Sequence, residues 1–103
     1  LAARPGLTLA RSRAAIFVHG CFWHRHHGCK RTTTPVNRAE FWQEKFRRNQ
    51  ERDAWAREAL LDDGWRVAIV WECALRIDPA AVGEAVSAWL RSGETEFEFP
   101  LRQ

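Results

Sequence analysis

Two short apolar runs constrain the fold of this chain more than any other feature. They are AAIFVHG at residues 14–20 and WRVAIVW at residues 65–71. Each has the length and the unbroken apolar character of a strand buried within a sheet. A long helix is predicted between them, over about residues 38–62, and a second helix over about residues 79–91. The order strand, helix, strand, helix predicts an α/β layer domain.

Two weaker patterns extend this layout at its ends. LTLA at residues 7–10 is compatible with a short strand, and ETEFEFP near the C-terminus alternates with period two, as an edge strand does. A chain of 103 residues is long enough for one domain and too short for two, so a single domain over residues 1–103 is expected. No apolar run approaches the roughly 20 residues of a membrane helix, and we expect a cytoplasmic protein with reduced cysteines.

Charge is unevenly divided between the two halves of the sequence. Residues 1–52 carry 11 Lys or Arg and 3 Asp or Glu, a net charge of +8, whereas residues 53–103 carry 5 and 10, a net charge of −5. A basic half suits a polyanionic partner, above all nucleic acid. A solvated basic face accounts for the charge equally well.

The segment between Gly20 and Asn37 is long for a connection within a compact domain. Zinc usually takes four ligands from Cys, His and occasionally Asp, and two of them are often close in sequence. His26 and Cys29 have such a spacing, and Cys73 directly follows the second apolar run. We therefore predict a zinc site that holds this segment, with the ligands His26, Cys29, Asp53 and Cys73. The alternative is that the cysteines are small buried hydrophobic residues, as we expect for Cys21.

The long predicted helix has a carboxylate on its apolar stripe. The stripe, with spacings of three and four residues, consists of Trp42, Phe46, Asn49, Asp53, Ala56 and Leu60. A carboxylate at such a position is costly unless it is paired or bound to metal. An ion pair of Asp53 with Arg57 or Arg66 is the alternative to metal ligation.

Aromatic and histidine side chains follow the first apolar run. Phe22 and Trp23 lie beside His19 and His24, where their rings suit either a protein core or stacking against bases. The two imidazoles suit general acid–base chemistry or metal binding near neutral pH. Surface histidines are the alternative.

Three blocks of this sequence closely resemble the very short patch repair (Vsr) endonucleases. They are FVHGCFWHRHHGC, RAEFWQEKFRRNQERD and GWRVAIVWECALR, in the same order, within a resemblance that covers about residues 4–76. Members of this family are bacterial DNA repair enzymes with a restriction-endonuclease-like α/β fold, a central mixed sheet flanked by helices. The resemblance implies a monomeric, nucleoid-associated enzyme that acts on double-stranded DNA. It would nick one strand beside the thymine of a T·G mismatch formed when 5-methylcytosine deaminates.

The resemblance also implies roles for individual positions. Phe22, Trp23 and Trp42 match an aromatic wedge that enters the duplex, and Lys45 and Asn49 match contacts to the mismatched pair. The ligands of the structural zinc of the family map to His26, Cys29, Asp53 and Cys73.

The catalytic centre of the family holds Mg²⁺ through an aspartate and a backbone carbonyl. The carbonyl position matches Val18, and the two nearby histidines match His19, beside the scissile phosphate, and His24, the general acid or base.

The sequence departs from the family at the metal-binding aspartate. The aligned residue is Gly6, in Arg4-Pro5-Gly6, and glycine has no side-chain oxygen, whereas Mg²⁺ prefers hard anionic oxygens. The N-terminal helix of the family also has no counterpart here, so we expect an N-terminal truncation. Three explanations are open: a degenerate descendant, an inactivated variant, or Glu72 as a substitute ligand.

These observations leave three functions open. The first is a Mg²⁺-dependent mismatch-nicking endonuclease. The second is a catalytically impaired, zinc-stabilised DNA-binding remnant. The third is a protein-interaction domain.

Overall fold

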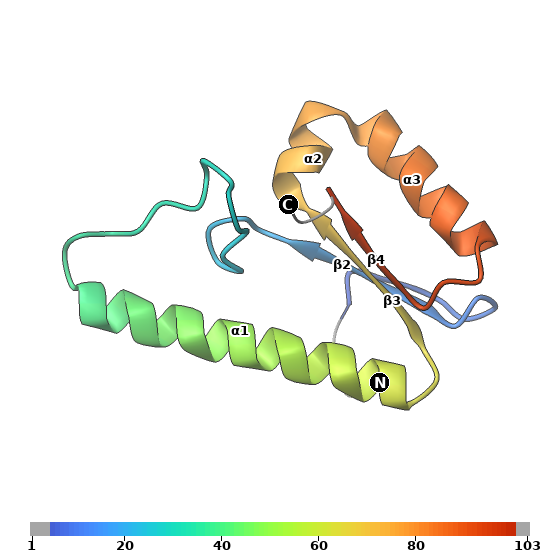
Figure 1. The fold of residues 1–103 in the computed structure, drawn as a ribbon, viewed down its shortest axis with the longest axis horizontal. Helices are drawn as coiled ribbons and strands as arrows, with labels where there is room; N and C mark the ends of the chain where they lie inside the picture. The colour runs from blue at the N-terminus through green and yellow to red at the C-terminus, as the bar shows by residue number, and fades with distance from the viewer. Residues whose placement is uncertain (1–4, 101–103) are drawn as a thin grey trace.

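A four-stranded mixed sheet lies at the centre of the protein, in the computed structural model that describes residues 5–100 (Figure 1). The strand order is β1-β2-β3-β4. β1 (Leu7–Leu9) pairs antiparallel with β2 (Ala14–His19), and β2 pairs parallel with β3 (Arg66–Trp71). β4 (Glu96–Phe99) pairs parallel with β3 and forms the opposite edge. The α/β prediction is confirmed, and the alternating C-terminal tail does form an edge strand.

Three helices connect the parallel strands. α1 (Ala39–Asp62) leads from β2 to β3, and α2 (Glu72–Ile77) and α3 (Pro79–Arg91) lead from β3 to β4. α1 and α3 match the two predicted helices closely. α2 was not predicted, because six residues are too few to show a helical period.

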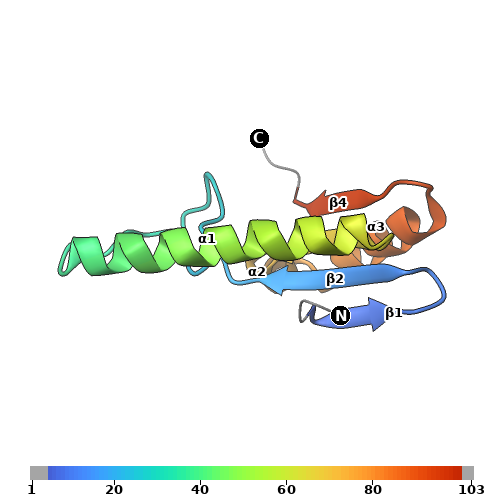
Figure 2. The same cartoon turned by 90° about the horizontal axis from the view of Figure 1, so that it is seen from below.

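The sheet is covered on both faces, since neighbouring residues of a strand point to opposite sides. Ala14 and Ile16 of β2 pack in the core beneath α2 and α3, together with Val82 and Trp89. Ala15, between them, packs on the other side with Val67 and with Leu60 of α1. The two views of the fold show α1 and α3 on opposite sides of the sheet (Figures 1 and 2).

α1 is longer than the sheet that it covers. Its 24 residues span about 36 Å, and its N-terminal half projects past the ends of the strands (Figure 1). Its C-terminal end is fixed by Gly64, which has φ +82°, and by Arg13, which donates to the carbonyl oxygens of Asp63 and Gly64 at 2.7 and 3.3 Å. Among the described helices, none combines the length and the apolar character needed to cross a membrane.

Candidate active site and metal centre

Residues 20–38, which we call the site loop, lie at the end of the sheet where β2 and β3 finish (Figure 1). The loop brings two groups of potential metal ligands together, each with its ligand atoms within 4.8 Å of one another. The sulfur cluster consists of Cys21, His26, Cys29 and Cys73. The histidine–aspartate cluster consists of His19, His24 and Asp53.

Two distances within the sulfur cluster match those of a tetrahedral zinc site. Nδ1 of His26 lies 3.6 Å from Sγ of Cys21 and 3.5 Å from Sγ of Cys73. Bonds of about 2.3 Å to sulfur and about 2.0–2.1 Å to nitrogen place two such ligands about 3.5 Å apart in a tetrahedron. Four ligands of the right chemistry within 4.8 Å of one another fit a structural zinc, which would tie the site loop to the start of α2.

Hydrogen bonds within the site loop hold the sulfur cluster together. The hydroxyl of Thr32 donates to the carbonyl oxygen of His26 at 2.7 Å and to that of Cys21 at 3.3 Å. Gly28 turns the chain between His26 and Cys29 with φ +74°, a conformation that glycine adopts without strain. Cys21 is fully buried, and this burial raises the pKa of its thiol to about 12.

One predicted zinc ligand lies elsewhere. The structure brings His26, Cys29 and Cys73 together as predicted, but it places Asp53 against His24, in the other cluster. Cys21, which we expected only to fill space, occupies the fourth position. The position of Cys21, five residues before His26, was the signal in the sequence for this ligand.

The histidine–aspartate cluster joins β2, the site loop and α1. Oδ2 of Asp53 lies 2.6 Å from Nδ1 of His24, and the imidazole rings of His24 and His19 stack with their centroids 3.9 Å apart. Neither Arg57 nor Arg66 pairs with Asp53, because Arg57 pairs with Glu96 and Arg66 caps the end of α3 through backbone carbonyls. The partner of the carboxylate on the apolar stripe is therefore a histidine.

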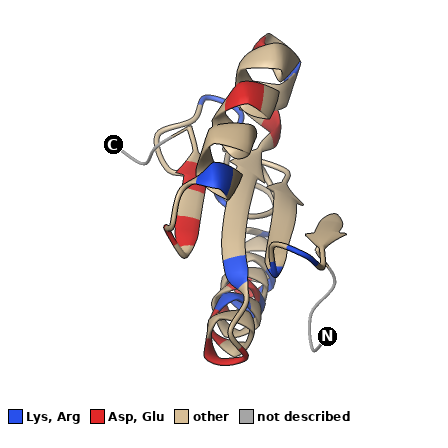
Figure 3. Ribbon diagram, turned by 90° about the vertical axis from the view of Figure 1, so that its right-hand side faces the viewer, with Lys and Arg blue, Asp and Glu red and all other residues tan. Residues whose placement is uncertain are grey.

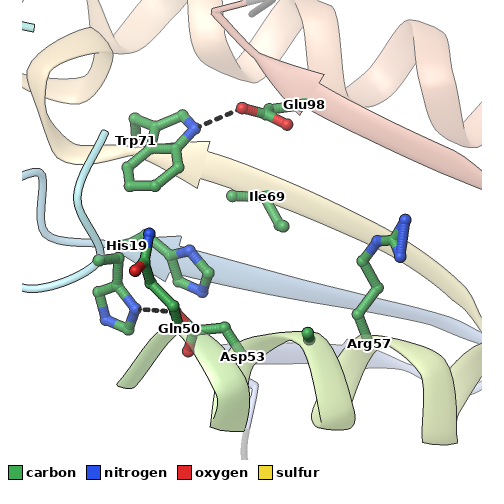
Figure 4. A pocket seen from close by; sticks show the side chains of 9 residues that line it. His19, Gln50, Asp53, Arg57, Ile69, Trp71 and Glu98 are labelled. Carbon is green, nitrogen blue, oxygen red and sulfur yellow. Dashed lines mark hydrogen bonds and ion pairs between the residues drawn. The ribbon is translucent and has the colours of Figure 1, made fainter. Parts of the chain in front are cut away.

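This cluster lies in an open pocket of about 350 Å³ between α1 and the sheet (Figure 4). The pocket is also lined by Gln50, Arg57, Ile69 and Glu98. Burial, and then the neighbouring His24, lower the pKa of His19 to about 4, so His19 is neutral at neutral pH. The arrangement of a carboxylate, an imidazole that it orients and a neutral second imidazole suits proton transfer.

Trp71 separates the two clusters. Its indole stacks on His26 with centroids 4.2 Å apart and meets His19 edge-on at 5.2 Å. Its Nε1 donates to Oε2 of Glu98 at 2.9 Å (Figure 4). The Trp71 side chain therefore contacts a histidine of each cluster.

An aromatic cluster covers the other side of the site loop. It consists of Phe22, Trp23, Phe41, Trp42 and Phe46, whose neighbouring ring centroids are 5.2–5.9 Å apart. Phe46 is buried, but Trp23 is 43% exposed and Phe41 is 45% exposed. Sequence reasoning overlooked Phe41, although FW occurs both at 22–23 and at 41–42.

The two remaining predicted DNA contacts border the aromatic cluster. Nζ of Lys45 lies 5.9 Å from the ring centroids of both Trp23 and Phe41, and Nδ2 of Asn49 donates to the carbonyl oxygen of Trp23 at 3.4 Å. Asn49 lies about one helical turn from Asp53 on α1.

Arg25 fixes the site loop against α1. Its guanidinium lies 4.0 Å from the ring centroid of Phe46, and it donates to the carbonyl oxygens of Phe22 and Thr33 and to the hydroxyl of Thr34. These contacts give the Arg25 side chain a positioning role within the loop.

The two positions implied for magnesium are neighbours, but they do not fit that ion. A Cβ built on Gly6 would lie 3.6 Å from the carbonyl oxygen of Ile16 and 4.0 Å from the amide nitrogen of Val18. There is room for a Cβ, yet glycine supplies no carboxylate, and Mg²⁺ depends on such oxygens. Glu72 does not replace it, because its carboxylate accepts from the amide of Cys21 at 3.2 Å and lies 3.7 Å from Arg76. Arg4 lies outside the described residues.

Basic and acidic residues are concentrated in different parts of the fold. Residues 20–52 carry 8 Lys or Arg and 3 Asp or Glu, a net charge of +5, in the site loop and the adjoining part of α1. Acidic residues mark β4 at the far edge of the sheet (Figure 3). The exposed aromatic rings therefore lie in the basic part of the molecule.

Comparison with known proteins gives consistent matches. The family described as DNA mismatch endonuclease Vsr matches residues 1–31. DNA mismatch endonuclease Vsr of Escherichia coli is 45% identical over 94 residues, 87% of this chain and 60% of that protein. The type II nicking enzyme V.XorIIP of Xanthomonas oryzae is 44% identical over 71 residues, 69% of this chain and 52% of that enzyme. The chain therefore spans between half and two thirds of these relatives.

Proposed function

We propose, on the premise that this chain is a member of the Vsr family of DNA mismatch endonucleases, that it recognises a T·G mismatch in double-stranded DNA and nicks one strand beside it. The observation that carries the proposal is the 2.6 Å contact between His24 and Asp53 beside the aromatic cluster. Asn49, proposed to contact the mismatched pair, and Asp53, which holds His24, lie about one helical turn apart on α1. We propose a monomer acting on DNA in the bacterial cytoplasm.

Binding would begin with the basic surface and end with stacking. Lys and Arg side chains of the site loop and α1 attract the phosphate backbone. Phe22, Trp23 and Trp42 then enter between base steps, where each stacked base contributes on the order of 1–3 kcal/mol. Trp23 is 43% exposed in the free protein, and moving its apolar surface out of water between bases is favourable, which supports this use of the cluster.

The chemical step would depend on the histidine–aspartate cluster. Asp53 holds the His24 ring in position through Nδ1, so that His24 transfers a proton during cleavage of the phosphodiester bond. His19, stacked on His24, presents a second imidazole to the same pocket. We assign general acid–base catalysis to His24 and positioning of the phosphate to His19.

The sulfur cluster would hold a structural zinc. Cys21, His26, Cys29 and Cys73 would supply all four ligands, so no coordination position is left for substrate. Zinc bound there supplies a crosslink between the site loop and α2, and it takes no part in the reaction.

Gly6 favours a second function, DNA binding with impaired cleavage. We expect the chain to bind a T·G duplex and to nick it slowly in Mg²⁺, because the position beside Val18 lacks a carboxylate. The test compares nicking of T·G and matched duplexes by the natural chain, by Gly6→Asp and by Gly6→Asn, a control that adds a side chain without its charge.

Gly6→Asp should nick the T·G duplex much faster than either other protein. Equal rates for the natural chain and Gly6→Asp would show that the metal site is not impaired. If none of the three proteins prefers the T·G duplex, the proposed substrate is wrong.

A further inference from the structure

The histidine–aspartate cluster has the composition of a transition-metal site. Its three ligand atoms, from two imidazoles and one carboxylate, lie within 4.8 Å of one another. Imidazole suits Zn²⁺, Co²⁺ and other first-row transition metals, and two histidines with one carboxylate form a known open set of ligands for them. Mg²⁺ requires oxygen ligands in near-ideal octahedral geometry. We propose that His19, His24 and Asp53 form a second metal site, which takes a divalent transition metal in preference to Mg²⁺.

Solvent ions can reach this cluster. The three side chains line the open pocket between α1 and the sheet, and the side chains of His24 and Asp53 are 27% and 26% exposed (Figure 4). Three protein ligands leave at least one coordination position to water. The site therefore resembles an open metal site, in contrast to the four protein ligands of the sulfur cluster.

Metal binding requires a small adjustment. With bonds of about 2.0–2.2 Å, nitrogen and oxygen ligands of a tetrahedral ion lie about 3.3 Å apart. Nδ1 of His24 and Oδ2 of Asp53, now 2.6 Å apart, would separate by about 0.7 Å, and the ion would replace the hydrogen between them. The displaced proton moves through solvent to Nε2 of the same ring, so that His24 binds the ion as a neutral imidazole. The stacked rings of His19 and His24 must tilt so that both nitrogens point to the ion.

The two metal sites would fill independently, because Trp71 lies between them. Its ring contacts His26 on one side and His19 on the other, so no ligand is shared. An ion at the histidine–aspartate cluster would also occupy the imidazole assigned to proton transfer. Excess Zn²⁺ should therefore inhibit nicking. This consequence rests on the proposed function, whereas the proposal of the metal site does not.

The test is a titration of the zinc-loaded chain with Co²⁺, followed by visible absorption and by calorimetry, without DNA. We expect a further equivalent of Co²⁺ to bind without thiolate-to-metal charge-transfer bands, and excess Mg²⁺ not to displace it. His19→Ala should abolish this equivalent, and Asp53→Asn should weaken it by about 10-fold or more.

His27→Ala is the matched control, since His27 is exposed and belongs to neither cluster; it should keep both equivalents. Retained zinc at the sulfur cluster shows that each variant is folded. The proposal is overturned if no further Co²⁺ binds, if His19→Ala and Asp53→Asn bind it as the natural chain does, or if Mg²⁺ displaces it. None of these outcomes depends on whether the chain nicks DNA.

Discussion

The two sides of the site loop differ in burial and in chemistry. On one side the sulfur cluster offers a closed set of four ligands, with Cys21 fully buried, His26 8% exposed, and Cys29 and Cys73 half-buried. On the other side the aromatic cluster leaves Trp23 43% and Phe41 45% exposed, surrounded by basic residues. Grouped exposed aromatic rings mark an interaction surface in a protein of this size. The difference indicates that one side of the loop stabilises the fold and the other contacts a ligand.

The largest expected effect comes from the closed side. Cys73→Ser removes a ligand from the sulfur cluster, and we expect zinc content to fall toward zero and the free energy of unfolding to fall by several kcal/mol, because metal binding and folding are coupled. Metal analysis and thermal unfolding measure both. Lys30→Ser, an exposed change in the same loop, is the control and should leave both unchanged. Full zinc content in Cys73→Ser would show that the sulfur cluster does not bind the zinc, and the contrast between the two sides of the loop would then fail.

A smaller effect, on DNA binding, is expected from the open side. Phe22→Ala and Trp42→Ala should each weaken binding to a T·G duplex by about 1–3 kcal/mol, because each removes a ring that would stack on a base. Fluorescence anisotropy of a labelled duplex measures the affinity. Trp55→Ala changes a 57% exposed tryptophan of the same helix outside the aromatic cluster, so it should bind normally. Unchanged affinity in Phe22→Ala and Trp42→Ala would show that the rings do not contact DNA.

The smallest effect is expected at Arg25, which lies between the two sides. Arg25→Gln removes the contact with Phe46 and hydrogen bonds within the loop, and we expect a loss of about 1 kcal/mol in stability and a similar loss in duplex affinity. Arg31→Gln makes the same charge change at an exposed neighbour. If the two variants lose equal affinity and neither loses stability, Arg25 acts only through its charge.

Most of the fold could be predicted because its elements depend on local pattern. The apolar runs, the spacing of the α1 stripe and Pro79 at the start of α3 each determine an element within a few residues of chain. Even β4 follows from the alternation of its side chains, although its parallel pairing with β3 does not. Pairing partners depend on the connections between strands, which local pattern does not describe.

The sequence by itself determined which residues could bind metal, transfer protons or stack on bases, because those abilities belong to side-chain chemistry. Only the tertiary structure decided how they are divided. Cys21 takes the ligand position that we expected for Asp53, because Cys21 is buried beside His26, whereas the path of α1 brings Asp53 beside His24. The side to which a residue of an irregular loop points is set by distant contacts such as those of Trp71 and Arg25, and these have no period in the sequence.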